Sequence, residues 1–341
     1  MSKITIQPPV TLTLLTTFKC TAACDNCCFQ CSPKASRMMS IEQIKRYIDT
    51  CLERYPTLKV VVFTGGECTL LGESLFEGIT HAKTRGLSTR IVTNGCWATS
   101  YTAALKFAKK LKYHGLTEIN FSTGDEHQAF VPFKHVRDAA IASIRCGLSC
   151  AINVETHDET HFDFEQILSK DKILKALSST TLEEGKIYIE RGIWAPMKKG
   201  YHPFTYKKYI EHFKFNRCIH LFNNIPINPY GEVLSCCGIT SETNPYMRIG
   251  NINTQDIGTI YERSVLDFLK VWIFVDGPEK VMSFIKEKRG ETNDFVTGHS
   301  CQICREIFCN KYNMAIVRKF SHEISSNVIY KYQLIKNNII T

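Results

Sequence analysis

The sequence contains no apolar run approaching the roughly 20 residues that a membrane-spanning helix needs. Its first residues also lack the apolar stretch and the small-residue cleavage site of a signal peptide. We therefore expect a cytoplasmic protein with no membrane partner, in a compartment where disulfides rarely persist. No internal repeat is visible, and the 11 histidines are scattered, form no ligand-like pair and are expected mostly on the surface. With 44% hydrophobic and 22% charged residues, extensive disorder is excluded.

Neither sign of charge dominates strongly. Lys and Arg number 42 against 33 Asp and Glu, which gives a net charge of +9, and the excess is spread along the chain. We interpret this excess as an ordinary solvated surface, with a weak preference for an acidic peptide as the alternative, and we predict no nucleic-acid partner.

Cysteine is the residue that the sequence has in excess. Sixteen cysteines among 341 residues still lie below the roughly 8–10% that marks a short disulfide scaffold. In a cytoplasmic protein, clustered cysteines more often bind metal or take part in chemistry. The first group comprises Cys20, Cys24, Cys27, Cys28 and Cys31, and the second comprises Cys218, Cys236, Cys237, Cys301, Cys304 and Cys309.

Between the two groups, short β-rich runs alternate with helical patterns about six times. Apolar residues repeat at helical spacing over residues 41–52, and Ser40 precedes them as a natural N-cap. This alternation predicts parallel βα units. Because six units fall short of the eight of a closed barrel, we expect an α/β fold with a partial (β/α)6 TIM-like barrel, or alternatively a doubly wound sheet. The predicted strands are residues 11–17, 60–63, 89–92, 118–121, 151–154 and 186–189, and the predicted helices are 41–52, 75–83, 103–113, 136–146 and 164–177.

The pattern changes after residue 216. Residues 217–310 are rich in Asn, Pro, Gly and Cys, with helical patterns only near 261–271 and 278–288. We predict a small Cys-rich domain that is held by metal rather than by a large core. The expected boundaries are 10–215 for the barrel, 216–312 for the Cys-rich domain and 313–341 for a C-terminal tail that forms a closing helix.

The first cysteine group begins directly after the first predicted strand. Cys20, Cys24 and Cys27 have the spacing C-x3-C-x2-C, on a loop at the C-terminal end of that strand, where the sites of parallel α/β folds assemble. Three thiolates can hold three irons of a 4Fe–4S cluster and leave the fourth iron open for a substrate. A zinc site is the alternative, with Cys28 or Cys31 as the fourth ligand.

A second motif, Thr64-Gly65-Gly66-Glu67, follows the second predicted strand. Its glycines let a backbone approach a ligand closely, and its carboxylate can hold an amine. Together with the C-x3-C-x2-C spacing, this motif resembles the radical SAM superfamily, in which the open iron of the cluster binds the amine and carboxylate of S-adenosylmethionine (SAM). The resemblance implies that the cluster ligands are Cys20, Cys24 and Cys27 and that the methionine end of SAM contacts Gly65, Gly66 and Glu67.

Polar residues at the ends of other predicted strands are further candidates for contacts with SAM. One residue departs from the family pattern, because the position before the third cysteine is usually aromatic and here is Asn26. The resemblance therefore leaves open which residue shields the adenine edge. The candidate contacts are Thr93, Asn94, Ser122, Asn153 and Glu155.

The second cysteine group contains four residues that chain turns can bring together. A proline–glycine turn within residues 228–235 is predicted to bring Cys218 close to Cys236, and Cys301 and Cys304 complete four thiolates, a full set for a closed cluster. A four-cysteine zinc site is the alternative. The spacing resembles the shortened SPASM (twitch) domain of radical SAM enzymes, which implies one auxiliary 4Fe–4S cluster held by these four cysteines.

Cys237 is left unassigned, directly beside a predicted ligand. It is either a buried small hydrophobe or a thiol that donates a hydrogen atom to a substrate. Residues 20–33, Phe63–Glu67, Asn94–Trp97 and the Cys236-Cys237 pair closely resemble the epipeptide epimerases, radical SAM enzymes that convert L-residues of a ribosomal peptide to D-residues.

This closer resemblance implies an isomerase in which a 5′-deoxyadenosyl radical abstracts a Cα hydrogen and the catalytic Cys237 returns a hydrogen to the opposite face. It implies SAM and two 4Fe–4S clusters as cofactors, and a precursor peptide and an electron donor such as flavodoxin or ferredoxin as partners. Residues 123–127 read Thr-Gly-Asp-Glu-His where the family has Tyr-Asp-Glu-Tyr-His, which indicates different substrate contacts. Two alternatives stay open: a radical SAM enzyme that crosslinks a peptide, and a non-catalytic iron–sulfur or zinc protein. Cys28, Cys31 and Cys309 receive no role and are expected to pack.

Overall fold

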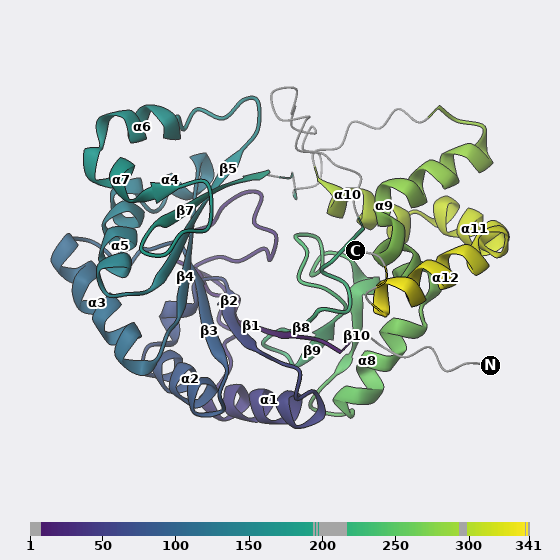
Figure 1. Cartoon of the computed structure of the whole chain (residues 1–341), viewed down its shortest axis with the longest axis horizontal. Coiled ribbons are helices and arrows are strands. Elements are labelled where there is room, and N and C mark those ends of the chain that lie inside the picture. The colour runs from purple at the N-terminus through teal and green to yellow at the C-terminus, as the bar shows by residue number, and fades with distance from the viewer. Residues whose placement is uncertain are drawn as a thin grey trace.

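The computed structural model describes residues 8–193, 195, 197, 217–292, 299–337 and 339 (Figure 1). The expected boundary at residues 215 and 216 lies outside the described residues. One sheet of ten strands runs through both parts of the chain, in the order β10-β9-β8-β1-β2-β3-β4-β5-β7-β6. Within the described ranges, no helix is long and apolar enough to cross a membrane.

Six parallel strands form the first part of this sheet. Neighbouring strands follow chain order from β1 to β5, and β7 takes the sixth place beside β5, with the short β6 (Ser178–Ser179) at the outer edge. All six predicted strands are therefore present. Their bounds are β1 Thr11–Thr17, β2 Val60–Gly65, β3 Ser88–Thr93, β4 Glu118–Thr123, β5 Ser149–Thr156 and β7 Ile187–Ile193.

Helices cover the convex face of the curved sheet, as Figure 1 shows. Side chains alternate along the strands, so that Ile119 and Phe121 of β4 are buried in the core, whereas Ser122 of the same strand borders an open cavity on the concave face. A doubly wound sheet would carry helices on both faces, and the predicted partial barrel is therefore confirmed. The outer helices are α1 Ile41–Arg54, α2 Glu73–Thr84, α3 Tyr101–His114 and α5 Phe133–Arg145.

Helix α1 illustrates why these segments fold as predicted. Ser40 accepts a hydrogen bond from the Gln43 N–H at 3.2 Å, and the Gln43 side chain accepts one from the Ser40 N–H at 3.0 Å. This reciprocal capping box satisfies backbone donors that the first helical turn leaves without partners. Ile44 and Ile48 then repeat at helical spacing and are fully buried. The expected N-cap at Ser40 is confirmed.

The second part of the chain continues the same sheet. Strand β8 (Asn224–Ile227) pairs in parallel with the free side of β1, and β9 (Glu232–Leu234) and β10 (Arg248–Asn251) add antiparallel strands. The predicted turn between β8 and β9 is present, with Gly231 at a φ of +80° that favours glycine. The helices that follow are α8 Ile257–Leu266, α9 Phe268–Arg289, α10 Ser300–Cys309, α11 Lys311–Phe320 and α12 Ser325–Lys336.

The prediction that this second part has little apolar core is wrong. Helix α9 packs against α8, α10, α11 and α12, and its Trp272, Ile273 and Phe274 are buried in a core that is continuous with the barrel. The polar, cysteine-rich composition of residues 217–310 hid this core, because its apolar residues are concentrated in a few helices. The two helices predicted near residues 261–271 and 278–288 correspond to α8 and α9, whose bounds differ from the prediction and which are separated by one residue. Helix α9 is kinked at Gly277 and Pro278. The tail forms two helices rather than one.

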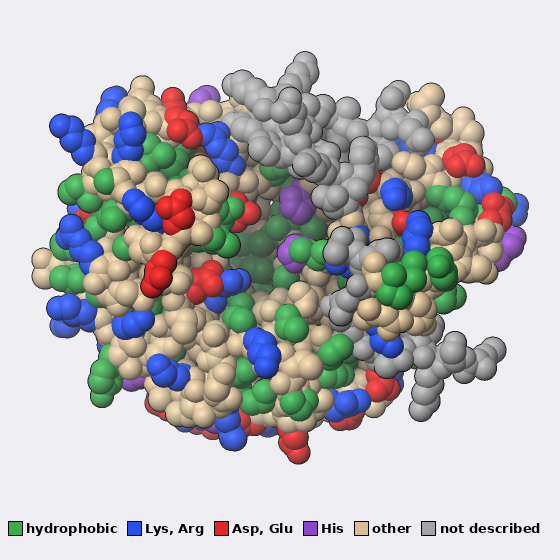
Figure 2. Space-filling model, in the orientation of Figure 1, with side chains coloured by type: hydrophobic (Ala, Val, Ile, Leu, Met, Phe, Trp, Pro, Cys, Tyr) green, Lys and Arg blue, Asp and Glu red, His purple; other side chains and the backbone are tan. Residues whose placement is uncertain are grey.

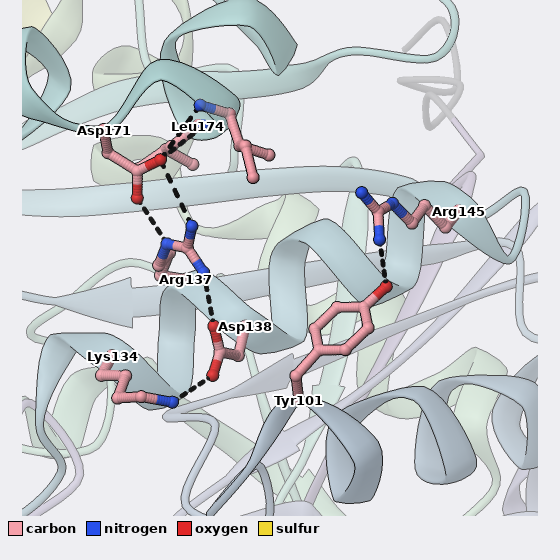
Figure 3. A network of polar contacts seen from close by, with 8 residues as sticks. Tyr101, Lys134, Arg137, Asp138, Arg145, Asp171 and Leu174 are labelled. Atoms are coloured by element: carbon pink, nitrogen blue, oxygen red, sulfur yellow. Dashed lines mark hydrogen bonds and ion pairs between the residues drawn. The ribbon is translucent and has the colours of Figure 1, made fainter.

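The predicted helix over residues 164–177 is divided in two. Asp171 ends α6 (Phe164–Lys170) and begins α7 (Lys172–Leu177), where its carboxylate accepts hydrogen bonds from the N–H groups of Ile173 and Leu174. Figure 3 shows Arg137 of α5 held between Asp171 and the buried Asp138. The Arg137 guanidinium lowers the pKa of Asp171. An N-cap inside a continuous apolar pattern is what divides this helix.

Replacing Arg137 by methionine should destabilise the fold by about 2 kcal/mol, because Asp138 is 2% exposed and would keep only the exposed Lys134 as a cationic partner. The measurement is the free energy of unfolding in urea. Arg145→Met on the same helix is the control, since the exposed Arg145 donates to the Tyr101 hydroxyl (Figure 3) and should change stability by less than about 0.5 kcal/mol. Equal stability of the two variants would contradict the conclusion that Arg137 stabilises the fold through the buried Asp138.

Candidate active site

The loop that follows β1 closes on itself and presents the first cysteine group. The N–H of Cys20 donates to the carbonyl of Ser32 at 3.2 Å, and the N–H of Ser32 donates to the carbonyl of Phe18 at 3.3 Å. Inside this loop, the Ala22 N–H donates to the Cys20 sulfur and the Cys31 N–H donates to the Cys27 sulfur, each at 3.4 Å. We call residues 18–32 the cluster loop. Its backbone holds two of the three predicted ligand sulfurs in place.

All five cysteines of the first group border one cavity of about 1290 Å³ on the concave face. Figure 2 shows this side of the molecule hollowed between its two halves, with histidine side chains at the hollow. Burial raises the pKa of Cys20 to about 11 and raises that of Cys24 further, and neighbouring thiols and carboxylates add to both effects. Hydrogen bonds from Cys31 instead lower the pKa of Cys27 to about 6. Bound cations would relieve the repulsion among these thiolates.

The Gly-Gly-Glu turn after β2 is bonded directly to the cluster loop. The Gly66 N–H donates to the Thr17 carbonyl at 2.6 Å, and the Glu67 N–H donates to the Lys19 carbonyl at 2.9 Å. A Cβ atom on Gly65 would lie 2.3 Å from the Thr17 oxygen, and one on Gly66 would lie 2.1 Å from the Lys19 oxygen. Only glycine fits at either position. The turn therefore reaches the cavity with its backbone beside the first cysteines.

The carboxylate of Glu67, for which contact with the amine of a ligand is predicted, is bonded to neighbouring protein groups. It is fully buried and does not border the cavity. Its carboxylate accepts hydrogen bonds from the Thr69 N–H and hydroxyl, from the Thr93 hydroxyl at 2.8 Å and from the Asn94 N–H at 2.8 Å. Three of these donors bond Oε1 and the Asn94 N–H bonds Oε2, so Oε2 can accept a further hydrogen bond. Glu67 thus supports the end of β3 from beneath the cavity, and the groups of this turn that face the cavity are its glycines.

The other predicted contact residues lie at the rim of the same cavity. Thr93, Asn94, Ser122, Asn153 and Glu155 all border it, at the C-terminal ends of β3, β4 and β5. The Asn94 amide donates to the Thr21 hydroxyl at 3.0 Å and lies 3.7 Å from the Cys20 sulfur. Asn94 is therefore tied to the cluster loop.

The four predicted ligands of the second group lie near one another behind the cavity. Cys236 follows β9, whereas Cys301 and Cys304 occupy the first turns of α10. A Cβ atom on Gly238 would lie 2.8 Å from the Cys301 sulfur and 3.7 Å from the Cys236 sulfur, so the chain passes close to both. Burial raises the pKa of Cys301 to about 12, and the Cys218 thiol adds to this effect. The exposed Cys309, at the other end of α10, contacts Asn244 instead.

Both parts of the chain match known protein families. Residues 14–139 match the Radical SAM superfamily, and residues 218–281 match the SPASM iron–sulfur cluster-binding domain. The chain therefore carries a radical SAM domain and a SPASM domain. The two matched segments contain both cysteine groups except for the cysteines on α10.

Individual relatives of this radical SAM protein are distant. A putative peptide biosynthesis protein, YydG of Bacillus subtilis (strain 168), is 27% identical over 120 residues, which is 35% of this chain and 37% of that protein. The match thus spans little more than a third of the relative's length. Among solved structures, anSMEcpe with bound AdoMet has a TM-score of 0.58 at 14% identity, over 94% of this chain and all of that one. BtrN in complex with AdoMet and 2-DOIA has a TM-score of 0.50 at 14% identity, over 81% and 91%. These two likenesses show a shared fold.

A radical SAM domain binds SAM and a 4Fe–4S cluster, and a SPASM domain binds auxiliary iron–sulfur clusters. The donor sets of this radical SAM protein fit both groups, since soft thiolates are the ligands of iron–sulfur clusters and the Gly-Gly turn leaves backbone space at the first set. Among the described residues, no three Cys, His, Asp or Glu side chains converge as a single metal ion requires. The family match sets aside the alternative of a non-catalytic zinc protein.

Cys237 lies near the second cysteine group, on the inner side of the barrel. Its sulfur accepts a hydrogen bond from the Asn224 amide at 3.4 Å. Burial raises the pKa of Cys237 to about 11, and the positive charge of Arg90 on β3 opposes this effect. Cys237 does not border the large cavity, whereas Cys28 does, and Cys28 lies near enough to both Cys27 and Cys301 for each to act on it.

Two histidines of this radical SAM protein lie at the cavity although their sequence pattern did not predict it. His127 and His299 both border the cavity, although the histidines were expected mostly on the surface. His127 pairs with Glu155, and burial keeps the pKa of Glu155 above its usual range despite this partner. A signal was present in the sequence, because His127 follows the predicted end of the fourth strand by only a few residues, where sites of this architecture assemble.

Proposed function

We propose that this radical SAM protein is a peptide epimerase that converts L-residues of a ribosomally made peptide to D-residues. In this proposal Cys20, Cys24 and Cys27 hold the SAM-binding cluster, and four cysteines hold one auxiliary cluster. The observation that carries the proposal is the spare Cys237 thiol, which is half-buried near these four and accepts a hydrogen bond from the Asn224 amide. The auxiliary ligands are Cys218, Cys236, Cys301 and Cys304.

A peptide is the substrate class that the cavity and the relatives favour. Small-molecule sites usually measure about 300–1,000 Å³, and this cavity is larger, with space beyond SAM for a peptide segment. Its wall extends from the cluster loop to the outer edge of the sheet at β6 and β7. YydG carries a name that assigns it to peptide biosynthesis, and anSMEcpe has also been solved with a Cp18Cys peptide.

The residues of the chain have distinct tasks in this reaction. The backbone of Gly65 and Gly66 receives the methionine end of SAM, while Glu67 keeps the turn and the end of β3 in register. When bound, SAM and the clusters supply the radical that removes the Cα hydrogen and the electrons that the cycle consumes. Cys237 then gives its thiol hydrogen to the planar carbon from the opposite face, which inverts the centre. One electron and one solvent proton restore the thiol.

Crosslinking of the peptide is the alternative reaction, and a count of hydrogens separates the two. Epimerisation exchanges one Cα hydrogen for a thiol hydrogen, so the peptide mass is unchanged in water. Crosslinking is a net oxidation in which the peptide loses two hydrogens and no donor thiol is needed.

The test is incubation of the reconstituted protein with SAM, a reductant and the precursor peptide encoded beside its gene, in deuterium oxide. We expect one deuterium at Cα of each inverted residue, because thiol hydrogens exchange with solvent. The measurement is peptide mass spectrometry with chiral amino-acid analysis after hydrolysis. A peptide that loses two hydrogens and carries no deuterium would instead establish crosslinking and refute the epimerase.

A further inference from the structure

We propose that Glu126 is a positioning residue for the SAM-binding cluster and that it acts through Asn26 of the cluster loop. Asn26 lies between Cys24 and Cys27 and is 1% exposed. It occupies the position at which the family usually has an aromatic residue. A buried amide at this position requires hydrogen-bond partners, since an unpaired buried polar group is costly.

Glu126 supplies those partners. The Asn26 backbone N–H donates to Glu126 Oε2 at 2.9 Å, and the Asn26 side-chain amide donates to Glu126 Oε1. The Asn26 side-chain oxygen accepts from the Met197 N–H at 3.0 Å. Both polar atoms of the Asn26 side chain are thus satisfied, and both carboxylate oxygens of Glu126 face the cluster loop. Hydrogen bonds to a charged acceptor are the stronger kind.

The short helix that carries Glu126 is itself fixed on two sides. In α4 (Asp125–Gln128), the Asp125 carboxylate accepts from the N–H groups of His161 and Phe162 at 2.8 Å each, and His127 pairs with Glu155 of β5. Gly124 approaches Glu155 so closely that a Cβ atom would lie 2.6 Å from it. Because Asp125 and His127, on either side of Glu126, are both bonded to other parts of the chain, the backbone that carries Glu126 is held in place relative to Asn26.

The two departures from the family pattern therefore meet in space. One is Asn26, and the other is residues 123–127, where the Glu126 side chain arises. The Glu126 carboxylate is bonded to the residue that lies between the predicted ligands Cys24 and Cys27. A fixed negative charge beside the ligands makes adding an electron to the cluster harder. Glu126 thus sets both the geometry of the loop and the potential of its cluster.

The experiment compares Glu126→Gln, Asn26→Asp and the double variant N26D/E126Q, each reconstituted as the full chain. In Asn26→Asp two acceptor groups face each other at the contact between side chains 26 and 126, and in Glu126→Gln the introduced amide places a donor where the wild type has only acceptor oxygens. We expect the affinity for SAM to fall about 10- to 100-fold in both, as for outer partners of metal ligands in general. In Glu126→Gln the midpoint potential of the first cluster should also rise. The double variant restores a matched pair, because the introduced glutamine amide can donate to the introduced aspartate carboxylate, and should recover most of the lost affinity.

Two controls separate positioning from a general loss of structure. Glu159→Gln makes the same chemical change on an exposed residue and should leave SAM affinity and potential unchanged. The auxiliary cluster is an internal reference, and its paramagnetic resonance signal should be the same in every variant. The proposal is overturned if Glu126→Gln keeps the wild-type affinity, potential and first-cluster signal, if both clusters change together, or if the double variant is no better than the singles. None of these measurements depends on the peptide reaction, so the proposal stands or fails apart from the proposed function.

Discussion

Cys237→Ala should abolish deuterium incorporation at the peptide Cα in deuterium oxide, while SAM cleavage to 5′-deoxyadenosine continues. The reason is that the predicted ligands of the SAM-binding cluster lie on the cluster loop, whereas Cys237 lies outside that loop, beside Asn224 of β8. Cys237→Ser should fail equally, because a serine O–H bond is too strong to give its hydrogen to a carbon radical. The measurement is the ratio of deuterated peptide to 5′-deoxyadenosine in a single incubation.

Cys28→Ala is the decisive control for this prediction. Cys28 borders the large cavity and Cys237 does not, so Cys28 is the rival thiol by position. We expect Cys28→Ala to retain deuterium incorporation and Cys309→Ala, at the exposed end of α10, to behave as wild type. If Cys28→Ala removes the deuterium and Cys237→Ala does not, the donor assignment is wrong.

Cys27→Ala should eliminate SAM cleavage altogether and lower the iron content by about four atoms per chain, the loss of one 4Fe–4S cluster. Cys27 is the ligand candidate whose thiolate the cluster loop stabilises most, through Cys31 and backbone hydrogen bonds. Without it, the loop keeps only two of its three predicted ligands. The measurements are iron analysis, visible absorbance under anaerobic conditions and quantification of 5′-deoxyadenosine.

The matched variants for this second prediction come from two other parts of the chain. Cys304→Ala should also lose iron, yet it should retain the first-cluster signal on binding SAM, because Cys304 lies on α10 with the auxiliary set. Cys146→Ala, at the half-buried residue that ends α5 outside both cysteine groups, should change neither quantity. Full SAM cleavage by Cys27→Ala, or zinc in place of iron in the wild type, would contradict the ligand assignment.

Local sequence patterns predicted the barrel because its determinants are local. The Ser40 cap, the apolar repeat of α1 and the polar residues that end each strand are all readable within a few positions. Motif spacing likewise placed both cysteine groups. The order of the strands followed from the βα rhythm, since each unit adds beside the last.

Long-range partners of buried polar groups were not readable in this way. The carboxylate of Glu67 accepts hydrogen bonds from Thr93 and Asn94 at the end of another strand, and neither partner follows from the motif. Asp171 divides a continuous helical pattern because its side chain caps the second helix. The apolar residues of α9 were masked by the polar loops around them. In each case the structure depends on a contact that local sequence patterns do not reveal. For Glu67 and α9 the contacting residues are far apart in the sequence, and for Asp171 the side chain bonds the backbone of the helix that follows.

The place of β1 in the sheet has a consequence for biosynthesis. It is made before β2 and β8, yet it lies between them, and β8 begins at Asn224, more than 200 residues after β1 ends at Thr17. Through Thr11, Leu12 and Leu14 it pairs with Asn224 and its neighbours, so both of its edges are covered only after these residues are made. The cluster loop follows directly from β1. The strands on both sides of β1 are therefore present only after β8 has been translated. A chain that ends before β8 would leave the first cysteine group after a strand that is paired with β2 along one edge and open along the other.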